Sequence, residues 1–307
     1  MRKSGGLEAT FAALAANVAI AASKFAAFAF TGSSALLAEG LHSVADSGNQ
    51  LLLLLGRHQA ERAPTPEHPF GFGGERYFYA FLVSVVLFFG GGLFALYEGY
   101  EKLLHPHPLE SWPWAIGVLA VAIVMESLSL RTAVRASNDV RGRRSWPAFI
   151  RQVKAPELPV VLLEDTAALI GLAFAGIGVT LTVLTGNAAF DGLGSIAIGA
   201  LLVVVAVVLA VETKSMIIGE AASAGIQKTI QETLAGEPLI QRVVNLRTLH
   251  VGPEHVLVAA EVQLPAGTDL GVAAKAIAQV EDRVRERLPV ASLIYLQPTT
   301  AELDDGD

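Results

Sequence analysis

Six stretches of the chain are apolar over the length that a helix needs to cross a lipid bilayer. Such a helix takes about 20 mainly apolar residues. The stretches are residues 7–30, 34–55, 77–103, 114–134, 158–184 and 192–218. The first follows Arg2 and Lys3 as a signal peptide would, but it lacks a convincing cleavage site and Lys24 interrupts it, so we interpret it as an uncleaved span. The pattern predicts an α-helical membrane protein with six transmembrane helices.

The pattern changes after Gly219, where more polar, periodic segments follow one another. They are an amphipathic helix at 226–234, strands at 243–250 and 255–264, a helix at 272–288 and a short strand at 293–296. An α-β-β-α-β order predicts a small α+β domain with its helices on one face of a sheet. We therefore expect a transmembrane domain over residues 1–219 and a soluble domain over residues 220–307, which ends in a short acidic tail at 302–307.

Basic residues in the loops predict how the chain crosses the membrane. With six spans both termini lie on one side, and cytoplasmic loops are enriched in Lys and Arg. The loops on the side of the termini carry Arg57, Arg62, Arg76, Arg141, Arg143, Arg144, Arg151 and Lys154, whereas the opposite loops carry only Lys102, near the end of a span. We expect both termini in the cytoplasm, and a multi-pass protein of a bacterial inner (plasma) membrane.

Composition narrows the choice of function. Hydrophobic residues make up 52% of the 307 residues and charged residues only 17%, whereas an average soluble chain carries roughly 25% charged residues. The net charge of −7 argues against a nucleic-acid-binding protein. The chain has no cysteine, which excludes disulfides, thiolate metal sites and cysteine nucleophiles.

A polar cluster interrupts the second apolar stretch. Glu39, His42, Asp46 and Asn49 occur where lipid would favour apolar side chains. His42 and Asp46 are four residues apart, so on a helix they project from one face, and Asn49 continues that stripe. Ionisable groups at this depth are costly and usually face a bundle interior or a water-filled path. Imidazole and carboxylate together suit zinc or another divalent metal ion.

A second polar cluster, Glu164 and Asp165, interrupts the fifth stretch. Adjacent positions on a helix differ by about 100°, so the two carboxylates point in different directions. We expect one of them to face the first cluster and the other to face a neighbouring helix or a water-filled cavity. A buried hydrogen bond or an ion pair with Lys24 is the structural explanation for a single acid. Two clusters on two spans, one containing histidine, favour a functional site.

Three stretches complete the picture. They are TGSSALLAEGLHSVADSGNQLLLLLG at 31–56, HPFGFGGERYFYAF at 68–81 and ETKSMIIGEAA at 212–222. Together with the α+β domain that follows, they resemble the cation diffusion facilitator family of divalent-metal/proton antiporters. The resemblance implies six transmembrane helices, a cytosolic ferredoxin-like domain and a homodimer with one transport site in each subunit.

The resemblance also implies a set of metal ligands. In such proteins the transport site consists of two HxxxD or DxxxD pairs, one on the second span and one on the fifth. His42 and Asp46 carry the first pair directly. If Asp165 takes the acidic place of the second pair, the place one turn earlier is Val161, which cannot ligate a metal. The implied set is then His42, Asp46 and Asp165, with Glu164, Asn49 or a water as the fourth ligand.

The expected function is therefore export of a divalent cation, most simply Zn²⁺, in exchange for protons by alternating access, and not catalysis. Iron, manganese or cobalt export stays open because acids outnumber histidine at the site. A non-transporting or regulatory family member with an incomplete site stays open too. A membrane-embedded hydrolase with a metal-activated water is a third class, but no motif for an oxyanion-stabilising group is visible.

Four smaller expectations concern individual residues. We expect an ion pair between Glu126 and Arg131, and a helix cap at Asp191 for the sixth span. We expect the glycines at 90–92 to allow close helix packing. His250 and His255 are the only histidines of the soluble domain, so we expect no strong regulatory metal site there, which leaves dimerisation as the role of this domain.

Overall fold

The computed structural model describes residues 4–109 and 111–300, with side chains from residue 18 onward. Arg2, Lys3 and the acidic tail at 302–307 lie outside the described residues. Contacts divide the chain into two compact units. Unit 1 comprises Met1–His58 and Phe78–Lys214, and unit 2 comprises Gln59–Tyr77 and Ser215–Asp307. The segment between the second and third long helices thus belongs with the C-terminal part of the chain.

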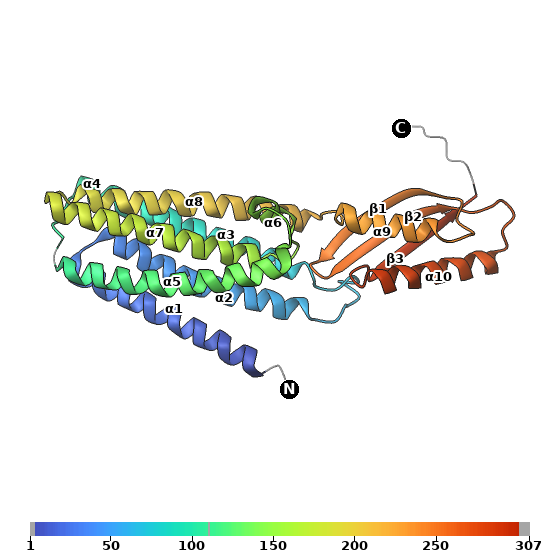
Figure 1. Cartoon of the computed structure of the whole chain (residues 1–307), viewed down its shortest axis with the longest axis horizontal. Helices are drawn as coiled ribbons and strands as arrows, with labels where there is room; N and C mark the ends of the chain where they lie inside the picture. Colours follow the sequence, from blue (N-terminus) through green and yellow to red (C-terminus); the bar gives the residue numbers. More distant parts are fainter. Residues whose placement is uncertain (1–3, 110, 301–307) are drawn as a thin grey trace. The chain divides into compact units, whose positions relative to one another are not determined.

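Unit 1 is a bundle of long helices that lie alongside one another (Figure 1). They are α1 (Ser4–Thr31), α2 (Ser34–Ala60), α3 (Glu75–Val86), α4 (Phe94–Leu104), α5 (Trp112–Arg141), α7 (Glu157–Thr185) and α8 (Ala189–Ile218). A π-helical segment, η1 (Leu87–Leu93), joins α3 to α4. The short α6 (Trp146–Gln152) begins where the Ser145 hydroxyl accepts a hydrogen bond from the Ala148 N–H.

The apolar stretches all fall on helices of this bundle. Four continuous helices in the described chain are long and apolar enough to cross a membrane: Glu75–Leu104, Trp112–Arg141, Glu157–Thr185 and Ala189–Ile218. The polar cluster of α2 lowers its hydropathy, and only Val18–Thr31 of α1 has described side chains. The protein is therefore an integral membrane protein, while the full number of six spans stays a prediction.

Glycines bring α4 and the end of η1 against α8. A Cβ atom on Gly99 would lie 2.6 Å from the carbonyl oxygen of Gly192, and one on Gly199 would lie 2.7 Å from the Leu96 nitrogen. A Cβ atom on Gly92 would lie 2.7 Å from Val203. These helices therefore touch backbone to backbone, as small residues allow in membranes. The expected close packing is confirmed at Gly92, whereas Gly90 has open space around it.

Asp191 caps a helix, but not the expected one. Its carboxylate accepts hydrogen bonds from the Ser34 N–H at 2.7 Å and from the Ser33 hydroxyl at 2.5 Å, so it caps the start of α2. The cap of α8 is Asn187, whose side-chain oxygen accepts a hydrogen bond from the Ala189 N–H at 3.0 Å. The expectation was wrong because α8 begins at Ala189, which places Asp191 inside the first turn.

Unit 2 contains α9 (Ala224–Ala235), β1 (Arg242–Gly252), β2 (His255–Gln263), α10 (Leu270–Arg287) and β3 (Leu293–Thr299). This α-β-β-α-β order is the predicted one. The sheet has the order β1-β2-β3, with β1 antiparallel and β3 parallel to β2. Alternate residues of β2, such as Val256 and Val258, are buried in one core with Ile230 of α9 and Val280 of α10.

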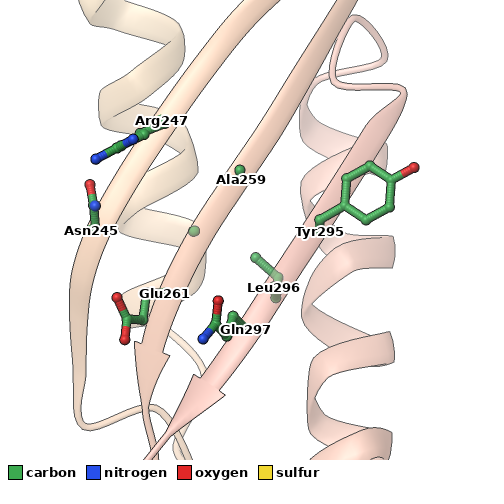
Figure 2. A pocket seen from close by; sticks show the side chains of 8 residues that line it. Asn245, Arg247, Ala259, Glu261, Tyr295, Leu296 and Gln297 are labelled. Atoms are coloured by element: carbon green, nitrogen blue, oxygen red, sulfur yellow. The ribbon is translucent and has the colours of Figure 1, made fainter. Parts of the chain in front are cut away.

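The other face of the sheet is not covered by these helices. Figure 2 shows side chains of β1, β2 and β3 projecting from it. They line a hollow of about 270 Å³ that includes Asn245, Arg247, Ala259, Glu261, Tyr295 and Gln297.

The segment 59–77 packs on the turn between β1 and β2. A Cβ atom on Gly73 would lie 2.7 Å from the carbonyl oxygen of Val251, so the two backbones are in contact there. Arg76 donates a hydrogen bond to Glu254 at 3.3 Å. This hydrogen bond joins the segment to the turn between β1 and β2 within unit 2.

Candidate metal-transport site

A small cavity inside unit 1 collects acidic side chains from three helices. Its volume is about 10 Å³. The lining residues are Ile20 of α1, Ser43, Asp46 and Gln50 of α2, Glu126 of α5, and Glu164 and Asp165 of α7. A volume of this size corresponds to a single water-sized occupant. The two predicted polar clusters therefore meet at one place in the bundle.

A hydrogen bond and a close steric approach bring α2 against α7 on either side of His42 and Asp46. Asn49 donates a hydrogen bond from Nδ2 to Oε1 of Glu164 at 2.6 Å. At the other end, Oε1 of Glu39 lies so close to Gly171 that a side chain at residue 171 would collide with it. His42 and Asp46 lie between these contacts along α2.

His42 is buried without satisfying either of its ring nitrogens. The residue is 1% exposed, and neither Nδ1 nor Nε2 has a hydrogen-bond partner in the described structure. Its Nδ1 lies 3.4 Å from Oδ1 of Asp46, and that oxygen also lacks a hydrogen bond. Buried polar atoms are nearly always hydrogen-bonded, so such exceptions call for an explanation. A neutral imidazole beside a carboxylate is an arrangement that suits binding of a divalent metal ion.

Glu164 and Asp165 border the cavity from different sides. Glu164 is held by Asn49 of α2, whereas Oδ2 of Asp165 accepts a hydrogen bond from the Ser129 hydroxyl of α5 at 2.9 Å. The expected difference in direction is confirmed, since Glu164 contacts the first polar cluster and Asp165 contacts a neighbouring helix. Both carboxylates also line the cavity. Val161 packs, half-buried, against the hydrophobic core of unit 1.

Lys24 forms its ion pair with Glu39 and not with an acid of α7. The Lys24 ammonium lies 3.1 Å from Oε2 of Glu39, and both side chains are 0% exposed. Lys24 also donates a hydrogen bond to the Ser43 hydroxyl at 2.7 Å. The charge of Glu39 is therefore balanced by Lys24 within the bundle. In this respect Glu39 differs from the acids that line the cavity.

Three of the predicted ligands, Asp46, Glu164 and Asp165, line the cavity, but the predicted ligands do not form a coordination sphere. Among the described residues, no three His, Asp or Glu side chains lie close enough together to hold a metal ion. His42, Asp46, Asn49, Glu164 and Asp165 are nevertheless gathered along the same contact between α2 and α7.

Sequence reasoning missed the contribution of α5. No ion pair joins Glu126 to Arg131 in the described chain; Glu126 lines the cavity instead. Residues five apart on a helix do not share a face, whereas Glu126 and Ser129 are three apart and do. Two polar residues one turn apart in an apolar span were the available signal.

The two histidines of unit 2 make separate local contacts. Nδ1 of His250 lies 3.3 Å from the carbonyl oxygen of Gly252, and Nδ1 of His255 lies 3.1 Å from the Ser292 hydroxyl. The expectation about regulatory metal binding in this unit stays a prediction.

Comparison with known proteins identifies relatives of the whole helical region. Residues 10–218 match the family model of the cation efflux transmembrane domain. The Xenopus laevis protein named proton-coupled zinc antiporter SLC30A9, mitochondrial, is 36% identical over 242 residues, which cover 78% of this chain and 43% of that protein. Its human counterpart is 34% identical over 242 residues, covering 78% and 42%.

A plant relative is more distant. Metal tolerance protein C4 of Arabidopsis thaliana is 28% identical over 252 residues, which cover 81% of this chain and 55% of that protein. The chain thus spans about half the length of these relatives. The vertebrate proteins are named mitochondrial, so the predicted bacterial inner membrane gains no support from them. Because the family model covers more than half of the chain, this protein belongs to the cation diffusion facilitator family, whose members are cation efflux transporters and not enzymes.

Proposed function

We propose that this protein is a secondary transporter that exports a divalent metal cation, Zn²⁺ in the first place, in exchange for protons by alternating access. The observation that carries the proposal is the buried imidazole of His42 beside the carboxylate of Asp46, because neither ring nitrogen has a hydrogen-bond partner among the residues that the structure describes. The names of the vertebrate relatives, proton-coupled zinc antiporters, support the same assignment.

The proposed ligands are His42, Asp46 and Asp165, with Glu164 or Asn49 as a further ligand. A metal ion needs a neutral imidazole and ionised carboxylates, so protons and metal compete for the same atoms. If the inward-open and outward-open states differ in their affinities for the two, metal export becomes coupled to proton entry. No other coupling machinery is then required.

Zinc flux in proteoliposomes tests the proposal. We expect His42→Ala and Asp165→Ala each to abolish flux. His105→Ala is a matched control, because His105 forms a similar pair with Glu101 four residues away, with Nδ1 and Oε1 2.7 Å apart, at an exposed position. Wild-type protein without flux would favour a non-transporting family member. Unchanged flux in the His42 variant would refute the proposed site.

The identity of the cation follows from competition in the same assay. Carboxylates outnumber imidazole around the cavity, and oxygen ligands favour harder cations than nitrogen ligands do. Zn²⁺, Mn²⁺, Fe²⁺ and Co²⁺ are therefore the ions to compare as competitors of radioactive zinc. Zinc as the strongest competitor supports the first choice, and any other order reassigns the substrate.

The membrane topology is part of the proposal. It has six spans, both termini in the cytoplasm, a transmembrane domain over residues 1–219 and a ferredoxin-like domain over 220–307. The apolar helices and the basic loops support it. Because the chain has no cysteine, single cysteines can be introduced and probed with membrane-impermeant reagents. Labelling from outside at His58 or Lys154 would contradict the orientation.

We propose a homodimer that forms through the open face of the sheet in unit 2. Arg247 and Glu261 lie on this face with the exposed ring of Tyr295 (Figure 2). In a two-fold interface, a residue of one copy that contacts a second residue of the other copy is matched by the reverse contact. A surface that carries both an arginine and a glutamate can therefore be complementary to itself. Arg247→Glu should then weaken dimers, and adding Glu261→Arg should restore them. Unchanged dimers in all variants would place the interface elsewhere.

A further inference from the structure

We propose that Glu126 of α5 is an additional ligand of the transported cation, so that a third helix completes the set that α2 and α7 leave incomplete. The inference rests on the proposed transport function. Glu126 is 9% exposed, and it lines the same cavity as Asp46, Glu164 and Asp165. Val161, at the place where a second ligand of α7 would stand, carries no ligating atom and packs in the core.

Ser129, a neighbour of Glu126 on α5, also contacts the site. Ser129, one turn after Glu126, donates a hydrogen bond to Asp165 at 2.9 Å. Positions three apart on a helix share a face, so the face of α5 that carries Glu126 is the one that contacts the acid of α7. The position of Glu126 at the cavity is therefore set by the packing of α5 on α7.

The four acids around the cavity need either a bound cation or protons to offset their charges. Asp46, Glu126, Glu164 and Asp165 surround a volume of about 10 Å³. The nearby Lys24 ammonium is paired with Glu39 at 3.1 Å and bonded to the Ser43 hydroxyl at 2.7 Å, so this single positive charge is too small to balance four acids. Like charges in a small buried space repel one another strongly. A bound divalent cation, or protons in its absence, offsets that repulsion.

Independent polar atoms at the site also lack partners. His42 is 1% exposed, and within the described part of the chain neither of its ring nitrogens has a hydrogen-bond partner. The same holds there for the side-chain oxygen of Asn49, although its Nδ2 donates a hydrogen bond to Glu164. These atoms and the acids are not yet within joint ligating distance in the described structure. We infer that a cation entering the cavity draws them together, and that Glu126 closes on it from the side of α5.

An extra carboxylate changes which cations the site prefers. Imidazole and thiolate favour softer ions such as Zn²⁺, whereas carboxylate oxygens suit Mn²⁺ and similar ions. A set with one imidazole and four carboxylates is rich in oxygen. Glu126 should therefore contribute more to the binding of Mn²⁺ than to the binding of Zn²⁺.

The test measures metal binding to the purified full-length protein by calorimetry and metal transport in proteoliposomes. Glu126→Gln keeps the shape but removes the charge, and Glu126→Asp keeps the charge. Loss of a group that only orients a ligand typically lowers metal affinity about 10–100-fold. Loss of a direct ligand should cost at least as much, so we expect roughly a tenfold or larger loss of affinity and rise in KM for Glu126→Gln. The loss should be greater for Mn²⁺ than for Zn²⁺, and Glu126→Asp should recover part of it.

Glu98→Gln is the matched control, since Glu98 is also a glutamate in an apolar helix, α4, but lies outside the cavity. It should bind and transport both ions as the wild type does. Wild-type affinity for both ions in Glu126→Gln overturns the inference. If His42→Ala abolishes flux in the same series, the proposed function stands without Glu126; if His42→Ala transports normally, the proposed function itself fails.

Discussion

Asn49 donates a hydrogen bond from its side-chain amide to the carboxylate of Glu164 at 2.6 Å, and so joins α2 to α7 beside the cavity. Both residues are at least 96% buried, with exposures of 0% and 4%. The contact links the two helices whose acids and histidine make up the proposed site. A change in the distance between these helices must therefore stretch or break it.

Asn49→Leu should destabilise the protein and weaken zinc binding. It leaves the buried Glu164 without its donor, and an unsatisfied buried polar group costs about 1–3 kcal/mol. Thermal unfolding in detergent and zinc calorimetry measure the two effects. Asn138→Leu is the control, because Asn138 is exposed and its side-chain oxygen accepts hydrogen bonds from Arg141, three residues later in α5. Equal stability of the two variants would contradict the structural role of Asn49.

Lys24→Met should be more damaging than removal of the whole Lys24–Glu39 pair. The single change leaves a buried carboxylate without its counter-charge, which typically costs about 3–5 kcal/mol. In the double variant Lys24→Met, Glu39→Gln no charge is left uncompensated. We therefore expect its unfolding temperature to lie between those of the single variant and the wild type. A double variant less stable than Lys24→Met would show that the pair is not the reason for the loss.

Ser129→Ala should raise the KM for zinc with little change in kcat. The Ser129 hydroxyl positions Asp165 through a 2.9 Å hydrogen bond, and partners that orient a ligand typically contribute about 10–100-fold to metal affinity. Ser127→Ala is the matched control, because its hydroxyl bonds to the carbonyl oxygen of Ile123 at an exposed position. Equal kinetics in the two variants would exclude a positioning role for Ser129.

Asp191→Ala should lower stability more than Asn187→Ala. Loss of an ordinary helix cap costs about 0.5–2 kcal/mol, and Asn187 represents that case for α8. Asp191 caps α2 from another helix and also lies 4.0 Å from the buried ammonium of Lys102. Its removal therefore adds the cost of a buried charge. Thermal unfolding of both variants decides the order, and a larger effect for Asn187 would refute it.

The sequence allowed the helices and strands to be predicted because apolar length and periodicity are local properties. The pairing of His42 with Asp46 was predictable for the same reason, since both lie on one helix. Contacts between different helices could not be predicted in this way, because they join residues that are far apart in the sequence. Asp191 of α8 accepts a hydrogen bond from Ser34 of α2, and Lys24 of α1 forms an ion pair with Glu39 of α2. Glu126 of α5 lines the cavity and does not pair with Arg131 in the described chain. Each of these partners lies on a different helix, and burial in a shared bundle decided the pairing.

The glycine contact between α4 and α8 has a mechanical consequence. The backbones of α4 and α8 are in direct contact where Gly99 meets Gly192 and where Gly199 meets Leu96, so the two helices have no room to slide past each other. We therefore expect α4 and α8 to move as one rigid pair while the cavity opens to one side of the membrane or the other. The movement then falls on the contact between α2 and α7, where the hydrogen bond from Asn49 to Glu164 can exchange with water. A disulfide engineered between α4 and α8 should leave zinc flux intact, and one between α2 and α7 should arrest it until it is reduced. If the disulfide between α4 and α8 stopped zinc flux, these two helices would have to move relative to each other during transport.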